Sequence, residues 1–236
     1  MTYFAILLVL TIIMIVIGRK SAMLRTEIFN ISNFQQLTLT QGLKCPRPAF
    51  SLGRTQLAFW IVIISSSFIY SVITHITPAG IEVPPIDAVN LILMGIAGGT
   101  TTIAKVIDSS QKDNQGASIP QQDYPSEGFF TDLISDERGV SIHRLQNVIW
   151  TLIVGFLYIG SVYYKKALPD ETVITTQLLA LMGISTGTYL GLKTAENKNA
   201  PVSSANVNTQ NTVSPIAPGV SDAMPSVLTQ NKQGTL

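Results

Sequence analysis

Four apolar stretches of 19 or 20 residues constrain the fold of this chain more than any other feature of its sequence. A helix rises about 1.5 Å per residue, so each stretch would be roughly 30 Å long, the thickness of the hydrocarbon core of a bilayer. A fifth stretch, at the N-terminus, has 16 residues. As a helix it would be about 24 Å long, and it would need local thinning of the bilayer or the help of flanking residues to cross. The five stretches cover residues 3–18, 55–74, 88–106, 145–164 and 174–192.

The overall composition agrees with a membrane protein, because 46% of the residues are hydrophobic and only 12% are charged. The buried helices of a soluble protein would need polar faces, which these stretches lack. The middle of each stretch contains no Asp, Glu, Lys, Arg or His, and this argues against proton pumps, voltage sensors and intramembrane hydrolases. We therefore predict an all-α integral membrane protein with five transmembrane helices, an N-terminal anchor followed by two helical hairpins.

Two sequence patterns occur twice and match the two hairpins to each other. The pattern S-x-x-R-x-Q-x-x-x-W at 51–60 returns 90 positions later at 141–150, and L-M-G-I-x-x-G-T at 93–100 returns at 181–188. Internal similarity at a long period indicates two copies of one structural unit. An entire hairpin and a loop separate the copies, so both copies would enter the membrane from the same side. We expect parallel repeats related by an axis along the membrane normal.

The chain divides into six predicted segments. They are a transmembrane anchor (1–20), a cytoplasmic segment (21–50), a first repeat hairpin (51–106), a cytoplasmic linker (107–140), a second repeat hairpin (141–196) and a disordered cytoplasmic tail (197–236). The tail is rich in Asn, Ser, Thr, Gln and Pro without an apolar period, which is typical of disordered chains.

The linker contains one predicted short amphipathic helix, between residues 126 and 139. Phe129, Phe130, Leu133 and Ile134 have helical spacing there. The polar face is acidic, so we expect docking on protein rather than on anionic lipid. Two alternatives stay open: the helix packs against its own bundle, or it binds a partner.

The positive residues predict the orientation of the chain. With the N-terminus outside, 13 of the 15 Lys and Arg residues lie on the cytoplasmic side, and only Lys165 and Lys166 lie outside. The hairpins resemble those of multi-pass proteins of bacterial membranes, so we expect the cytoplasmic (inner) membrane of a bacterium. A formal net charge of +1 argues against a nucleic-acid partner. The single cysteine, Cys45, excludes an internal disulfide, and it is either a free thiol or an acylation site.

Glycines on two of the predicted helices have the spacing of helix-packing motifs. Gly95 and Gly99, and then Gly183, Gly187 and Gly191, stand four residues apart. In a membrane, such glycines let a second backbone approach closely. We predict that they pack helices, either within the chain or between two copies of it.

Other polar residues suggest an alternative, a polar path through the membrane. Thr100 and Thr188 would line this path, with Gln56 and Gln146 at its inner mouth.

Basic and aromatic residues at the ends of the stretches are predicted to anchor the helices at the membrane interface. The four basic residues alternatively form a site for a lipid headgroup or an anionic partner. The predicted anchors are Arg54, Trp60, Lys105, Arg144, Trp150 and Lys193.

No catalytic, cofactor or metal motif stands out. His75 and His143 would lie at opposite membrane faces, so they could not share a metal ion. Two functional hypotheses follow. The first is a non-enzymatic membrane scaffold or anchor, oligomeric, whose cytoplasmic segments bind another membrane or cytoplasmic protein. The second is a pore-forming channel or uniporter subunit built from the two repeats.

Overall fold

The structure is a computed structural model that describes residues 1–28, 31–42, 47–78, 80–81, 83–110, 124–136 and 139–198. Cys45, and the predicted tail from residue 199 on, lie outside these described residues.

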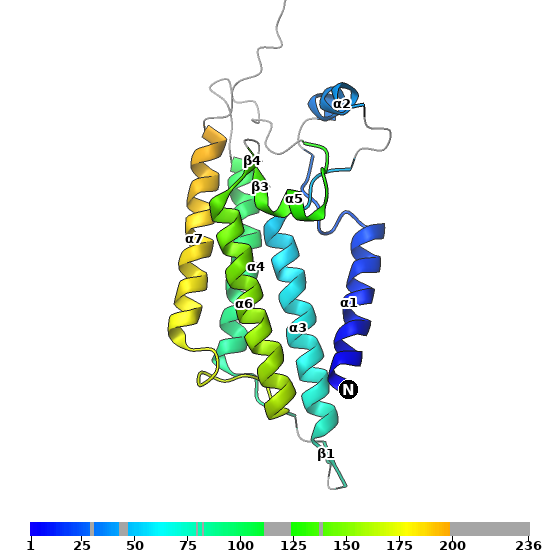
Figure 1. The fold of residues 1–236 in the computed structure, drawn as a ribbon, viewed down its shortest axis with the longest axis vertical. Helices are drawn as coiled ribbons and strands as arrows, with labels where there is room; N and C mark the ends of the chain where they lie inside the picture. The colour runs from blue at the N-terminus through cyan, green and yellow to red at the C-terminus, as the bar shows by residue number, and fades with distance from the viewer. Residues whose placement is uncertain are drawn as a thin grey trace, which may run out of the picture. The chain divides into compact units, whose positions relative to one another are not determined.

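Five long helices run side by side in the part of the chain that the structure describes (Figure 1). Helices α3 and α4 are connected by a short hairpin of strands β1 and β2, and α6 and α7 follow as a second pair. The bounds are α1 (Thr2–Lys20), α3 (Leu52–Thr74), β1 (Ile76–Thr77), β2 (Gly80–Ile81), α4 (Ala88–Ser110), α6 (Ile142–Lys165) and α7 (Thr176–Lys198).

The other elements lie at the end of the bundle where α3 and α6 begin, which we call the α5 end (Figure 1). The strands β3 and β4 are antiparallel and pair Ser135 with Val140. The elements at this end are α2 (Ile31–Thr40), α5 (Phe129–Ile134), β3 (Ser135–Asp136) and β4 (Gly139–Val140).

Four of the helices, α1, α3, α4 and α6, are long and apolar enough to cross a membrane. The fifth, α7, has the same 23-residue length as α3 and α4, but hydroxyl and amide side chains such as Gln177, Ser185 and Thr186 lower its hydropathy. Four of the five predicted spanning helices therefore have the length and apolarity that a crossing needs. The crossing of α7 stays a prediction.

Helix α1 is longer than its apolar stretch, because it starts at Thr2 and includes Arg19 and Lys20. Its 19 residues give a length of about 28 Å. The added Arg19 and Lys20 are charged, so the apolar stretch itself is no longer than the sequence indicated.

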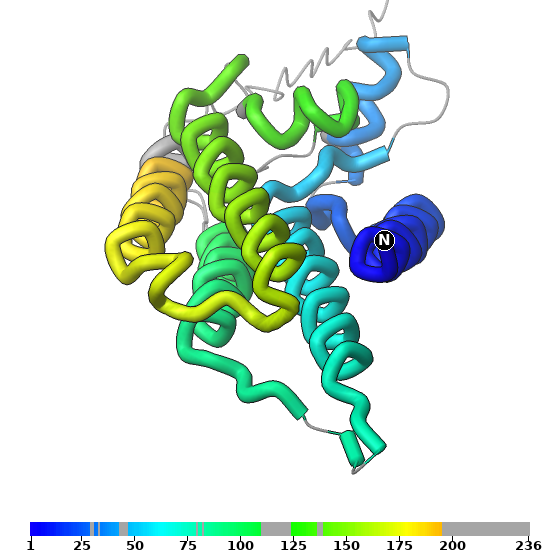
Figure 2. Tube along the Cα trace, turned by 60° about the horizontal axis from the view of Figure 1, so that its bottom comes forward, coloured from blue at the N-terminus to red at the C-terminus, as the bar shows by residue number. Residues whose placement is uncertain are grey.

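Helices α3, α4, α7 and α6 form a closed ring of neighbours, and α1 packs mainly on α3. Figure 2 shows α1 outside the ring. The core inside the ring is built around Trp60, Val89, Leu93, Val154 and Tyr158. A second, smaller cluster around Leu52, Leu133 and Tyr189 lies near the α5 end.

The two hairpins begin in the same way. Ser51 precedes α3 and Ser141 precedes α6, with backbone angles of φ −85°, ψ 123° and φ −94°, ψ 119°. Each serine N–H donates to a carbonyl oxygen 2.8 Å away, in Leu24 and in Ile134. The residue before each serine forms a β-bridge, Phe50 with Arg25 and Val140 with Ser135. The repeated pattern thus gives the same local start at these two sites, while the relation between the whole hairpins stays a prediction.

Helix α5 is shorter than the predicted amphipathic helix. It covers Phe129–Ile134 and ends because Ser135 takes an extended conformation and enters β3. Helix α5 packs on α6 and α3 through the buried Leu133, so it does dock on its own bundle. Phe130 points away from the bundle and is 79% exposed.

Candidate functional site

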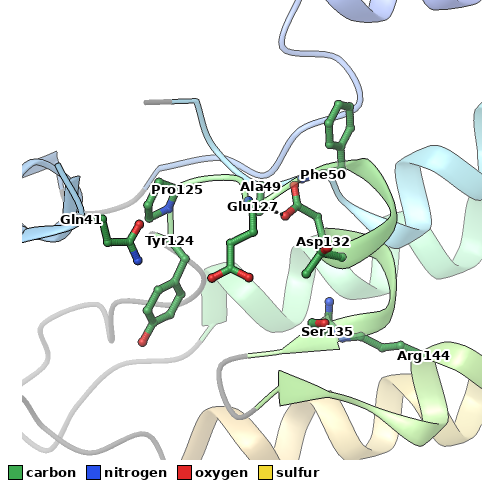
Figure 3. Close-up of a pocket in the computed structure, with 10 residues that line it drawn as sticks. Gln41, Ala49, Phe50, Tyr124, Pro125, Glu127, Asp132, Ser135 and Arg144 are labelled. Carbon is green, nitrogen blue, oxygen red and sulfur yellow. Dashed lines mark hydrogen bonds between the residues drawn. The ribbon is translucent and has the colours of Figure 1, made fainter. Parts of the chain in front are cut away.

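A cavity of about 220 Å³ opens at the α5 end of the bundle (Figure 3). Its walls come from the end of α2, the segment that leads into α3, the segment around α5, and the first turn of α6. The lining residues are Gln41, Ala49, Phe50, Tyr124, Pro125, Glu127, Thr131, Asp132, Ser135 and Arg144.

Asp132 holds one wall of this cavity together. Its Oδ2 accepts hydrogen bonds from the backbone N–H of Phe50 (3.0 Å) and from Ser126 Oγ (2.6 Å). Its Oδ1 accepts one from the backbone N–H of Glu127 (3.0 Å). A buried carboxylate is stable when donors satisfy it in this way. Asp132 therefore ties α5 to the segment leading into α3, although the sequence suggested only that it belonged to an acidic polar face.

Phe50, which also lines the cavity, is covered by a guanidinium group. Arg25 Cζ lies 4.2 Å from the centre of the Phe50 ring, and the guanidinium donates to the carbonyl oxygen of Pro48. Burial and the nearby charge of Arg47 lower the pKa of Arg25, while Asp132 raises it. Because the Arg25 head is already bonded and stacked, it holds the Phe50 ring in place without lining the cavity itself.

Arg144 is a buried basic residue with whose charge no described residue forms an ion pair. The residue is only 5% exposed. Its one recorded contact is with the ring of Tyr189, whose centre lies 5.7 Å from Cζ. The prediction that Arg144 anchors the helix in the lipid headgroups is thus wrong, since the side chain is enclosed by protein.

Lys193 is also buried, which corrects its assignment as an interface anchor. Its Nζ forms an ion pair with Asp108 Oδ2 at 2.8 Å, which joins α7 to α4. The side chain of Asp108 is partly exposed, and its Oδ1 has no partner.

Arg54 and Lys105 share one partner at the boundary of the bundle. Glu27 Oε1 accepts from Arg54 Nη2 at 2.7 Å and from Lys105 Nζ at 3.0 Å. The side chains of Lys105 and Glu27 are largely exposed. Glu27 thus links the start of α3 to the last part of α4, and the role of Arg54 and Lys105 as interface anchors stays a prediction.

The two tryptophans have different surroundings. Trp60 is 1% exposed and packs edge-on against Phe59 and Tyr158 inside the ring of helices. It cannot reach the headgroup layer, so the anchor prediction is wrong for this residue. Trp150 is half-buried at the edge of the core.

The predicted packing glycines do not pack helices within this chain. No atom lies within 4 Å of where a Cβ would stand on Gly95, Gly99, Gly183, Gly187 or Gly191. Packing between two copies of the chain stays a prediction for them.

A glycine that the sequence analysis missed makes the close contact instead. A Cβ on Gly155 of α6 would lie 2.5 Å from Phe59 Cζ of α3. Gly155 lies outside the repeated small-residue pattern, so no spacing signal indicated it.

The four residues of the predicted polar path are not brought together. Gln56 and Thr100 are buried, whereas Gln146 and Thr188 are exposed on the outer faces of α6 and α7. Among the residues that the structure describes, Thr188 bonds within its own helix, to the carbonyl oxygen of Ile184.

A polar network that includes Gln56 lies inside the ring of helices. Gln56 Nε2 donates to Thr151 Oγ1 (2.8 Å), and Asn147 Nδ2 donates to Gln56 Oε1 (3.5 Å). Thr186 Oγ1 donates to Asn147 Oδ1 (3.4 Å), so the network links α3, α6 and α7. The repeat pairs Gln56 with Gln146, but the face of α6 that points inward carries the next residue, Asn147. The positions of the inward-facing residues along α6, rather than the repeated pattern, could have identified Asn147.

A second polar pair lies in the core between α6 and α4. Tyr158 Oη donates to Asn90 Oδ1 at 2.5 Å, and both residues are fully buried. Neither residue was singled out in the sequence, because each is the only polar group in its turn of an apolar stretch.

Among the described residues no group of three or more His, Cys, Asp or Glu side chains could hold a metal ion. The polar groups that line the cavity belong to Arg144, Glu127, Asp132 and hydroxyl-bearing side chains. Comparison with protein-family models gives no match, and neither a curated protein nor a solved structure is significantly similar to this chain.

Proposed function

We propose that this protein is a non-enzymatic membrane scaffold that holds a partner protein at its α5 end. One observation carries the proposal: apolar side chains are exposed on three adjacent elements there. They are Phe130 of α5, Val140 of β4 and Ile142 of α6, which are 79%, 66% and 74% exposed. Contiguous exposed apolar groups mark interaction surfaces.

The rigid attachment of this surface supports a docking role. The bonds to Asp132 fix α5 to the start of α3, and the β3–β4 pair fixes it to the start of α6. A preorganised surface loses less conformational entropy when a partner binds. The docking surface thus moves with the membrane helices, as a scaffold requires.

The location is part of the proposal. The excess of positive residues puts the N-terminus outside and the α5 end and tail in the cytoplasm, in the inner membrane of a bacterium. Association with a second copy would use the exposed glycines of α4 and α7. The test of orientation is labelling of intact cells with a membrane-impermeant thiol reagent, after Cys45→Ser. Glu171→Cys should react and Ser214→Cys should not, and the reverse result would contradict the orientation.

The docking proposal is tested by placing a photo-crosslinking phenylalanine analogue at position 130 in living cells. We expect a discrete adduct with one protein. The matched control is Phe4, an exposed residue of α1, where we expect adducts with lipid. If position 130 also gives lipid adducts alone, the surface lies in the headgroup layer and the docking role is wrong.

A pore or uniporter subunit is the second candidate function. It is favoured by buried polar atoms without a partner, namely Asn90 Nδ2, Ser71 Oγ, Ser161 Oγ and Ser185 Oγ. It is disfavoured by the network around Gln56, because groups that bond to one another are not available to a solute. Solute flux into liposomes that contain only the purified protein would support the pore, particularly if Asn90→Leu abolished the flux.

A further inference from the structure

The charge of Arg144 has no counterpart in the described structure. The described residues form ion pairs at Glu27, Asp108 and Asp170, and none of these includes Arg144. Asp132, the acidic wall residue on α5, has both carboxylate oxygens bonded to other donors. A charge removed from water is costly unless it is paired. The contact with the Tyr189 ring compensates only part of this cost, because cation–π contacts are weaker than ion pairs.

The cavity gives this charge an accessible side. Figure 3 shows the Arg144 side chain extending from α6 toward Ser135 and the cavity, while the carboxylate of Glu127 faces the cavity from another element. No described residue forms an ion pair with Glu127. The cavity is thus lined by a buried positive charge that no described residue pairs and by a solvent-exposed negative charge. Its volume of about 220 Å³ corresponds to roughly seven water molecules at about 30 Å³ each.

We propose that this cavity binds a small zwitterionic ligand. Its phosphate or carboxylate group pairs with the fork of Arg144, which suits a bidentate contact with such groups. Its ammonium group faces Glu127, and its carbon atoms lie against Phe50 and Pro125. The ligand is either free in solution or the headgroup of a lipid such as phosphatidylethanolamine. The inference does not depend on the docking of a partner protein at Phe130.

The test uses the full-length protein, purified in detergent without phosphate. The probes are O-phosphoethanolamine, inorganic phosphate and ethanolamine, each titrated while the midpoint of thermal unfolding is measured. A ligand that binds only the folded state raises this midpoint with concentration. We expect a saturable rise with O-phosphoethanolamine, a weaker one with phosphate and none with ethanolamine. The lipid source is tested in phosphatidylcholine nanodiscs with and without phosphatidylethanolamine.

Three variants separate the site from its surroundings. Arg144→Gln should weaken binding of O-phosphoethanolamine at least tenfold. Glu127→Gln should weaken the same binding while leaving that of phosphate unchanged. Arg54→Gln is the matched control, since it occupies the equivalent repeat position but pairs with Glu27 outside the cavity, and it should bind as the parent does.

Several results would overturn the proposal. One is the absence of any shift with the soluble probes together with no effect of phosphatidylethanolamine. Another is unchanged binding by Arg144→Gln. If Arg144→Gln does not fold, the binding of O-phosphoethanolamine to Glu127→Gln is the deciding measurement, because Glu127 is exposed and its variant should fold normally. Equal affinity of Glu127→Gln and the parent for O-phosphoethanolamine would contradict the zwitterionic ligand.

Discussion

Arg144 and Lys193 are both buried cations at the same end of the bundle, but within the described part of the chain only Lys193 has a counter-charge. An unpaired buried charge lowers the stability of the ligand-free protein, and sites for ligands commonly carry such a cost. Removing the charge of Arg144 and removing that of Lys193 should therefore have opposite effects.

We predict that Arg144→Met raises the free energy of unfolding by about 1–3 kcal/mol, since it replaces an unpaired charge with an apolar side chain of similar length. Lys193→Met should lower it by about 2–4 kcal/mol, because Asp108 would lose its partner. Both values are measured by denaturant unfolding in one detergent without added ligand. A loss of stability in Arg144→Met would mean that the guanidinium has a partner within the chain.

Glu27 makes stability dependent on pH. Its hydrogen bonds with Lys105 and then with Arg54 lower the pKa of the carboxyl group below its ordinary value of 4.5. The folded state therefore holds this proton less tightly than the unfolded state does. The contribution of Glu27 is complete above pH 4.5 and is lost as the pH falls through the lower pKa of the folded state.

We accordingly expect the midpoint temperature of thermal unfolding to decrease as the pH is lowered below about 4.5. This decrease should be less steep in Glu27→Gln. The effect should be small, because Glu27 is largely exposed and salt screens its ion pairs. The matched control is Glu171→Gln, which removes an exposed acidic residue with no recorded ion pair. Equal slopes in the parent and in Glu27→Gln would contradict a role for these ion pairs.

At the scale of elements, close packing depends on Gly155 rather than on the repeated glycines. Gly155 meets Phe59, whereas Gly187 of α7 faces outward with no neighbour within 4 Å. Leucine is a better helix former than glycine by roughly 1 kcal/mol. At Gly155 a leucine would clash with Phe59, and this clash opposes the gain in helix propensity. At Gly187 only the gain applies, so the two substitutions should change the free energy of unfolding in different directions.

Gly155→Leu should lower the free energy of unfolding by about 1–3 kcal/mol or more, through overpacking against Phe59. Gly187→Leu should leave the stability of the single chain unchanged or raise it slightly. Chemical denaturation in detergent at a concentration where the chain is monomeric measures both. Equal losses in the two variants would mean that Gly187 also contacts another part of the chain.

The long helices could be predicted from the sequence because apolar length alone sets them. The short elements at the α5 end could not. The predicted helix lay between residues 126 and 139, whereas α5 covers only Phe129–Ile134, because Ser135 pairs in a strand. Asp132 was visible only as one of several acids, since its three donors come from backbone and serine groups that no side-chain pattern encodes. The residues of the candidate site were therefore accessible only through tertiary contacts.

At the scale of the molecule, the two hairpins lie side by side. Equivalent helices contact each other, α3 with α6 and α4 with α7. A two-fold axis between the hairpins would instead bring α3 against α7 and α4 against α6, and these are not among the principal contacts of the described helices. The sequence repeat indicates two equivalent units, but it does not specify which faces they use, because that depends on side chains outside the repeated pattern, such as Phe59 and Gly155.

This arrangement leaves an outer face of α7 without a neighbour among the described residues. Its exposed residues include Ala180, Ile184, Gly187, Thr188 and Gly191, most of them small. In lipid, where apolar surface alone drives no association, small residues favour close helix contacts through dispersion and weak hydrogen bonds. A second copy of the chain could therefore approach along this face.

We predict that the purified protein is a dimer or larger assembly in mild detergent, and that Gly187→Leu converts it to the monomer. The leucine would separate the two backbones and remove the contacts that depend on their closeness. Size-exclusion chromatography with light scattering measures the mass after subtraction of the detergent. The control is Ile92→Leu, a conservative change on the exposed face of α4, which should leave the mass unchanged. If Gly187→Leu has the mass of the parent assembly, this face of α7 contacts lipid, and association, where present, uses another surface.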